Sequence, residues 1–396
     1  MNTSKSQSSV LWLQVCGLAA VQGAIALTWV IYNLYLPKLM NQFGFSPGLI
    51  TSLLIFETGL AVVMEPLMGG LSDEAQQWLG SRFPFIAVGV VLASALFITI
   101  PAVVIFASPV GGVQWVLPRV MVAWALAMTI FRSPALSLLG RYAFATKLPQ
   151  AASVLTLVGA VAGAIGPLAN QFILSLGPAI TFATGSIVLL GAAAVLRFVN
   201  HQASITSSET ASAVHKISIL NLGLIFGTGV GVALGFRLVM ETLPKVLKSQ
   251  LPEENVGLAI GAIFISLALA AIPAGGLAVR LGNKRAMLIG VGAMAGLSAL
   301  ILFANSVVIA VAIGIALGAA FSLIANGTIP FALALVPPNK AGLGTGMYFS
   351  GAALASSLFG FILVPSGVVT SSSGILVGAI AFLVAGVCIT VGGKRI

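Results

Sequence analysis

Six ionisable side chains interrupt long apolar stretches of this sequence: Glu57, Glu65, Arg119, Arg132, Arg237 and Glu241. Each one costs roughly 2.5–3.5 kcal/mol or more if it faces lipid at the middle of a bilayer. We therefore expect each to face the inside of a helix bundle or a cavity and to have a partner there. A carboxylate that alternates between burial and an arginine neighbour can also bind and release a proton, because the two environments favour opposite charge states.

Depth along a helix predicts which of these residues are partners. At about 1.5 Å of rise per residue, Glu57 lies at the depth of Arg119, and Glu65 lies at the depth of Arg132. We predict two acid–base pairs between the second and fourth spans, with Glu57 and Glu65 as proton-coupling groups. The alternative for Glu57 is a permanently paired or protonated side chain that fixes helix packing. The alternative for Glu65 is a gate formed with Asp73 and Arg132.

Arg237 and Glu241 are four residues apart, so they lie on one face of a helix and can pair along it. Both lie toward one end of the seventh apolar stretch. We interpret them as a local ion pair at the membrane interface, and the alternative is an outer gate or a substrate contact.

Membrane-spanning helices are the elements that must position these residues. The chain has 396 residues, of which 59% are hydrophobic and 7% charged, and its mean hydropathy is +1.13. A water-soluble protein of this length cannot bury that much apolar surface. The apolar runs are continuous and about 20 residues long, which is typical of transmembrane helices and not of alternating barrel strands. The sequence predicts an all-α polytopic membrane protein.

The apolar runs form two groups of six. The predicted spans are 11–36, 48–71, 83–107, 113–140, 148–175, 178–199, 217–243, 256–280, 285–304, 306–335, 342–364 and 372–392. A Ser/Thr/Ala-containing polar segment at 200–216 separates the groups and has the composition of a mobile linker. We predict an N-terminal six-helix bundle at 1–199 and a C-terminal one at 217–396.

Basic residues predict the orientation in the membrane. With the N-terminus inside, three lysines face outward, Lys38, Lys245 and Lys248, and twelve basic residues face the cytoplasm: Lys5, Arg82, Arg141, Lys147, Arg197, Lys216, Arg280, Lys284, Arg285, Lys340, Lys394 and Arg395. Both termini are then cytoplasmic, and the short loops suit a bacterial inner membrane. The net charge of +10 is scattered and forms no stripe, which argues against a nucleic-acid partner.

Nothing in the sequence indicates an enzyme. It contains no nucleotide-binding loop, no nucleophile–base pair and no metal-ligand spacing, so we expect no cofactor and no metal. The two histidines, His201 and His215, lie in the linker, where a solvated role is expected. Cys16 and Cys388 lie in apolar runs and are interpreted as small apolar fillers. The expected partners are the lipid bilayer, a small solute and protons, and the expected state is a monomer.

The two halves resemble each other in sequence. Residues 35–50, YLPKLMNQFGFSPGLI, align with residues 242–258, and residues 69–86 align with residues 275–290. The shifts are 207 and 206 residues, which indicates an internal repeat with both halves in parallel topology. Parallel six-helix repeats are an architecture of transporters, with the binding site at the repeat interface near the midplane.

A glycine-rich motif follows the second span in each half. Gly69, Gly70, Asp73, Gly80 and Arg82 form it in the first half, and Gly275, Gly276, Gly282, Lys284 and Arg285 form it in the second. This pattern and the twelve-span repeat resemble the major facilitator superfamily. We predict that Asp73 accepts hydrogen bonds from a facing helix N-terminus or a basic group in one conformation only, which biases a two-state equilibrium.

Narrower resemblances point to two kinds of transporter. The segment EPLMGGLSD at 65–73, together with 328–349, is similar to the glycoside and sucrose cation-symporter branch. Ala61 replaces a second acidic residue of that branch, so the resemblance favours a proton over sodium. The segment GAVAGAIGPLAN at 159–170 resembles a motif of proton-coupled exporters, and its glycines also suit close helix packing.

We expect a secondary active transporter that works by alternating access, with proton-coupled sugar or glycoside import as the leading interpretation. The alternatives are a proton-driven exporter of drugs or metabolites, and a non-transporting receptor or assembly factor. In the superfamily, the first, fourth, seventh and tenth spans line the cavity. Polar and aromatic residues of the first and fourth spans are candidates for the cavity, and the resemblance adds Asn326 and Thr328 of the tenth span. The candidates of the first and fourth spans are Gln22, Trp29, Tyr32, Asn33 and Trp124. For each aromatic residue the alternative is helix packing or an anchor at the membrane interface.

Overall fold

The computed structural model describes residues 10–107, 111–200, 217–248, 253–303, 306–367 and 373–393. These residues form helices and contain no strand. Twelve of the helical segments are long and apolar enough to cross a membrane. The prediction of an all-α polytopic membrane protein is therefore confirmed.

The first half comprises α1 (Trp12–Gln42), α2 (Pro47–Leu79), α3 (Phe83–Phe106), α4 (Val116–Ser137), α5 (Leu139–Tyr142), α6 (Leu148–Ser175) and α7 (Pro178–Asn200). The second half comprises α8 (Ile219–Lys248), α9 (Glu253–Leu281), α10 (Asn283–Leu300), α11 (Val307–Ala334), α12 (Ala341–Leu358) and α13 (Ser373–Gly392). The main buried apolar cluster of each half draws its buried members from that half alone. Apart from Asn200, the predicted linker 200–216 lies outside the described residues.

Helix α2 is longer than the predicted span 48–71. It continues through Asp73 to Leu79 because residues 72–79 contain no proline or glycine that interrupts a helix. Gly80 then ends the helix with φ +68°, a left-handed conformation that favours glycine. The paired glycines Gly69 and Gly70 therefore lie inside α2, and the turn to α3 is confined to the residues around 80–82.

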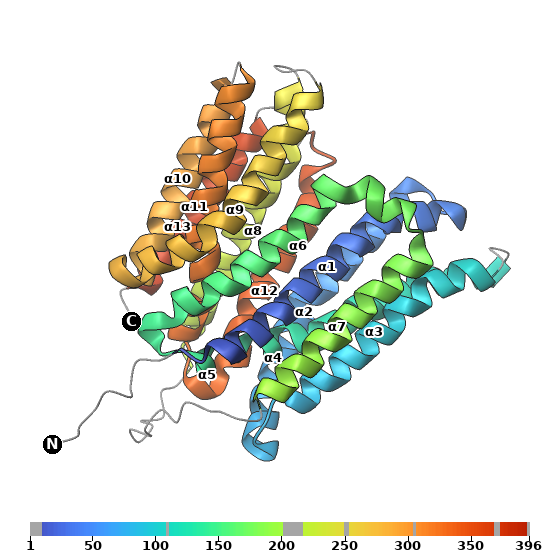
Figure 1. The fold of residues 1–396 in the computed structure, drawn as a ribbon, viewed down its shortest axis with the longest axis horizontal. Helices are drawn as coiled ribbons and strands as arrows, with labels where there is room; N and C mark the ends of the chain where they lie inside the picture. The colour runs from blue at the N-terminus through green and yellow to red at the C-terminus, as the bar shows by residue number, and fades with distance from the viewer. Residues whose placement is uncertain are drawn as a thin grey trace.

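The two halves meet along two helix pairs, α2 with α12 and α6 with α9. In Figure 1 the halves are close together near α4, α5 and α12, and their helices diverge toward the opposite end. We call the end that carries the 80–82 turn the α2–α3 end. There, Leu333 of α11 packs against the apolar cluster of the first half and lies next to Gly140 of α5.

Candidate functional site

Glu65 and Arg132 form a buried ion pair between α2 and α4. Arg132 Nη2 lies 2.5 Å from Glu65 Oε1, and the Glu65 side chain is fully buried while that of Arg132 is 20% exposed. The Ser133 hydroxyl donates a hydrogen bond to Glu65 Oε2. This is the contact that the matching depths predict, and it gives the buried carboxylate a cation and a hydrogen-bond donor.

Arg132 also reaches across to the second half. Its guanidinium carbon lies 4.3 Å from the centroid of the Phe349 ring on α12, within the range of a cation–π contact. Phe349 in turn lines the central cavity described below. Phe349 is not recognisable from the sequence alone, because one phenylalanine among 22 carries no signal until α12 is placed against α4.

Glu57 has a different partner from the one predicted. The Tyr32 hydroxyl of α1 donates a hydrogen bond of 2.5 Å to Glu57 Oε1, and Glu57 Oε2 is buried without a hydrogen-bond partner. Arg119 is exposed, and no ion pair joins it to Glu57 in the described part of the chain. The prediction of a Glu57–Arg119 pair is therefore wrong.

The helical period explains this error. Successive residues turn by about 100° around a helix of 3.6 residues per turn. Glu57 and Glu65 are thus separated by about 80° around α2, whereas Arg119 and Arg132 are separated by about 140° around α4. Depth alone predicted both pairs, but once Arg132 faces Glu65, Arg119 points away from α2.

An aromatic cluster surrounds Tyr32 inside the first half. The Tyr32 and Trp124 ring centroids are 4.4 Å apart, Trp29 lies 4.9 Å from Trp124, and Phe97 stacks on Trp124 at 5.0 Å. Tyr32 and Trp124 are fully buried. They therefore belong to the core that holds Glu57. They do not line the cavity between the halves, although they were candidates for it.

The other predicted cavity residues divide between the cavity and structural positions. Gln22 and Thr328 line the cavity. Asn33 is exposed and donates to the Trp29 carbonyl oxygen within α1 at 2.8 Å. Asn326 is fully buried and donates to the Ala271 carbonyl oxygen at 2.7 Å, so it joins α11 to α9.

A cavity of about 270 Å³ lies between the two halves. Its wall combines residues of α1, α4 and α6 with residues of α8, α9, α11 and α12. Polar groups come from Gln22, Thr156, Thr328 and Tyr348, and aromatic rings come from Phe236, Phe264, Phe321, Tyr348 and Phe349. The rings of Phe236 and Phe321 stack at 4.1 Å, so this part of the wall is a flat aromatic surface.

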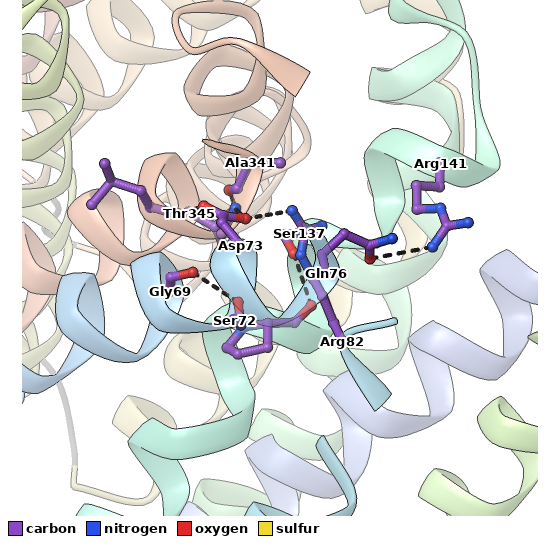
Figure 2. A network of polar contacts seen from close by, with 12 residues as sticks. Gly69, Ser72, Asp73, Gln76, Arg82, Ser137, Arg141, Ala341 and Thr345 are labelled. Carbon is purple, nitrogen blue, oxygen red and sulfur yellow. Dashed lines mark hydrogen bonds and ion pairs between the residues drawn. The ribbon is translucent and has the colours of Figure 1, made fainter. Parts of the chain in front are cut away.

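Asp73 connects the halves at the α2–α3 end, as Figure 2 shows. Its carboxylate accepts hydrogen bonds of 2.8 Å from the backbone N–H groups of Gly342 and Leu343. These two residues are in the first turn of α12, where unpaired N–H groups and the helix dipole favour an anion. Asp73 also forms an ion pair with Arg82. It thus has both predicted kinds of partner, and we call these four residues the Asp73 cluster.

Arg82 is buried beside Asp73. Arg82 is only 2% exposed. Burial lowers the pKa of its guanidinium from the ordinary value, and the Asp73 carboxylate opposes that shift. Next to this pair, Arg141 of α5 contacts Gln76 Oε1 of α2 at 3.5 Å (Figure 2).

Glycines allow α2 and α12 to approach closely. A Cβ atom on Gly342 would collide with the Gly69 carbonyl oxygen, and it would lie 2.7 Å from Asp73 Oδ1. A Cβ on Gly346 would likewise collide with the Glu65 carbonyl oxygen. Further along the same helix pair, the Ser357 hydroxyl donates to Thr58 Oγ1 at 2.8 Å. The contact therefore extends from the Asp73 cluster past Glu65 toward the depth of Glu57.

We predict that Gly342→Val opens the α2–α3 end. The added side chain overpacks a backbone contact, which costs about 1–3 kcal/mol and disfavours the closed arrangement. Gly276→Val is the matched control, because a Cβ there meets nothing within 4 Å. Spin labels on the exposed residues Gln77 and Asn339, in a chain without Cys16 and Cys388, should move apart only in Gly342→Val. An unchanged distance distribution would contradict this prediction.

The second-half motif lacks this charge arrangement. Gly275 lies against Ser153 of α6, where a Cβ atom would come within 2.6 Å of the serine Cβ. Gly282 has φ +86° and precedes α10, and Asn283 donates to the Gly327 carbonyl oxygen at 3.0 Å. Val279 occupies the position that Asp73 has in the first half. Neither Lys284 nor Arg285 forms an ion pair with a described residue.

The predicted Arg237–Glu241 ion pair is absent from the described residues. Glu241 instead pairs with Lys245 one turn further along α8, at 3.4 Å. The Arg237 guanidinium carbon lies 4.6 Å from the centroid of the Phe359 ring. Arg237 and Glu241 are both exposed. The Phe359 ring gives Arg237 a favourable contact that the sequence spacing does not predict.

The described helices, with a cavity and closely packed helix pairs between the two halves, have the fold of two solved transporters of the major facilitator superfamily. The structure is similar to that of the proton:xylose symporter XylE of this superfamily bound to 6-bromo-6-deoxy-D-glucose, with a TM-score of 0.69 and 13% identity over 95% of this chain and 94% of that chain. It is also similar to FucP, a transporter of this superfamily in the outward conformation, with a TM-score of 0.67 and 11% identity over 96% of this chain and 98% of that chain.

At the level of sequence, no model of a protein family matches this chain. No curated protein sequence matches it either. The likeness is therefore one of fold.

Proposed function

We propose that this protein is a secondary active transporter in which the two halves, residues 1–199 and 217–396, rock about a central solute site. The cavity between the halves carries this proposal, because residues of both halves line it. A solute bound there contacts both moving parts. Its binding energy can therefore differ between two arrangements of the halves, which is the requirement for shifting their equilibrium.

Charge distribution supports an orientation with both termini in the cytoplasm, as the basic residues predict. The α2–α3 end then faces the cytoplasm, and the Asp73 cluster closes that side. The described arrangement corresponds to a state that is closed to the cytoplasm. We propose a monomer in a bacterial inner membrane.

Proton coupling is proposed for the two buried carboxylates of α2. Glu65 is connected to the cavity through Arg132 and the Phe349 ring. A solute that displaces this ring weakens the hold on Arg132, and this changes the electrostatic environment of Glu65. Glu57 has a tyrosine partner and no cation in the described residues. An unpaired buried charge is costly, so a proton on Glu57 relieves that cost.

A sugar or glycoside is the substrate class that we propose. Aromatic rings in the wall offer stacking surfaces for the apolar face of a sugar ring, and Gln22, Thr156, Thr328 and Tyr348 offer groups that hydrogen-bond hydroxyls. Gln22 Oε1 is buried without a hydrogen-bond partner, so a ligand hydroxyl can satisfy it. The sugar analogue bound in the XylE structure agrees with this class.

One observation favours export of a hydrophobic compound as the second candidate. Most of the cavity wall consists of Phe, Leu, Ile and Ala side chains. Such a wall suits an apolar or aromatic compound better than a free monosaccharide. The two candidates differ in the direction of transport as well as in substrate polarity, so one assay separates them.

The test is accumulation in proteoliposomes with the outside one pH unit more acidic than the inside. Labelled D-xylose, D-glucose, sucrose and a phenyl glucoside are compared with a cationic dye. For a one-proton symporter we expect about tenfold accumulation of a sugar or glycoside, which is abolished by a protonophore. Proton-driven accumulation of the dye in inside-acidic vesicles, without sugar uptake in outside-acidic ones, would favour the exporter, and no movement of any compound would favour a non-transporting receptor.

A further inference from the structure

A second cavity lies away from the solute site, on the flank of the first half at the α2–α3 end. Its volume is about 440 Å³, and α3 and α7 form its two walls. Val90, Val91, Leu190, Ala193 and Ala194 make most of the lining apolar. Arg197 and Ser81 add the polar groups, and both lie near the ends of the spans.

Arg197 is held at one end of this groove. Its guanidinium carbon lies 5.1 Å from the centroid of the Phe83 ring, which is a cation–π distance. Within the described residues no carboxylate lies within ion-pair distance of Arg197. Arg82, the neighbouring arginine, is neutralised by Asp73. Among the described residues, the groove therefore presents one positive charge, on Arg197, without a carboxylate partner.

The dimensions of the groove suit a phospholipid. Leu190 lies seven residues before Arg197 on α7, which is about 10 Å along the helix. The groove thus begins at the end of a span, where a headgroup lies, and continues into the depth of the acyl chains. A cation at the surface and an apolar channel below it match the two parts of an anionic lipid, and each such cation contributes about fivefold to binding.

We propose that this groove binds one anionic phospholipid, with its phosphate on Arg197 and an acyl chain between α3 and α7. The site does not depend on the transport function. It lies on helices of the first half only, so the lipid contacts that half alone and anchors it to the bilayer at the α2–α3 end.

Native mass spectrometry of the full-length protein, given equal amounts of phosphatidylglycerol and phosphatidylcholine in detergent, tests the proposal. We expect wild type to retain phosphatidylglycerol with about fivefold preference. Arg197→Gln should lose this preference. Ala194→Trp fills the groove at an exposed position and keeps the positive charge of Arg197, and it should also lose the preference. Arg280→Gln, at an exposed arginine in the last turn of α9, should behave as wild type.

Any result that differs from these four expectations would overturn the proposal. A wild type without preference, or a preference that survives Arg197→Gln, removes the site. A preference that survives Ala194→Trp shows that the charge acts without the groove. Loss in Arg280→Gln shows a general effect of positive charge. Elution as a single species in size exclusion establishes that each variant is folded before its lipids are compared.

Discussion

Glu65→Gln is expected to abolish proton-driven accumulation while leaving solute exchange across the membrane largely intact. Glutamine keeps the size of the side chain and can still accept the hydrogen bond of Ser133, but it cannot carry a proton. With a pH difference of one unit, the ratio of inside to outside solute concentration should fall from about 10 to about 1. Counterflow of labelled against unlabelled solute needs no net proton movement, so it should persist.

Glu74→Gln is the matched control for this experiment. Glu74 is an exposed carboxylate on the same helix, and its replacement should change neither accumulation nor exchange. Glu57→Gln should reduce accumulation less than Glu65→Gln, because the hydrogen-bond partner of Glu57 is Tyr32 inside the first half, which does not line the cavity. Unchanged accumulation in Glu65→Gln would remove this residue from proton coupling.

Arg132→Met is expected to have the largest effect on stability. It leaves the fully buried Glu65 carboxylate without its cation. Removing one partner of a buried ion pair costs about 3–5 kcal/mol, because an uncompensated charge stays in a low-dielectric site. Glu65→Gln should cost less, since the Arg132 side chain is 20% exposed and retains its contact with Phe349.

Two further measurements identify the cause of this loss. The double variant Glu65→Gln/Arg132→Met contains no buried charge at the site, so it should recover much of the unfolding free energy in SDS-containing mixed micelles. A proton also neutralises the orphaned carboxylate. Arg132→Met should therefore be most stable at low pH and lose stability as the pH rises. A loss that is independent of pH and persists in the double variant would indicate a packing defect instead of a charge defect.

Features that depend on position along the chain could be predicted from the sequence. The twelve spans follow from hydropathy, and the Glu65–Arg132 pair follows from depth. Features that depend on direction around a helix could not be predicted in this way. Depth assigned Arg119 to Glu57, whereas the rotation of α4 turns Arg119 outward and leaves Tyr32 as the partner.

Contacts between the halves were the hardest to predict. The motif around Asp73 indicated a helix N-terminus or a basic group as its partner, and the structure identifies α12 and Arg82. Phe349 was missed because its importance comes from touching Arg132 and the cavity at once. The length of α2 was underestimated at the paired glycines, of which Gly69 packs closely against α12.

The proposed mechanism requires that the two halves move as rigid bodies and expose the cavity alternately to the two sides of the membrane. Double electron–electron resonance in lipid nanodiscs tests it with one label pair at each end, Gln77 with Asn339 at the α2–α3 end and Asn41 with Lys248 at the other. In Gly342→Val, relative to wild type and Gly276→Val, the account predicts that the first distance lengthens and the second shortens. Lengthening of the first distance with no change in the second would contradict rocking and leave only a local separation of α2 from α12.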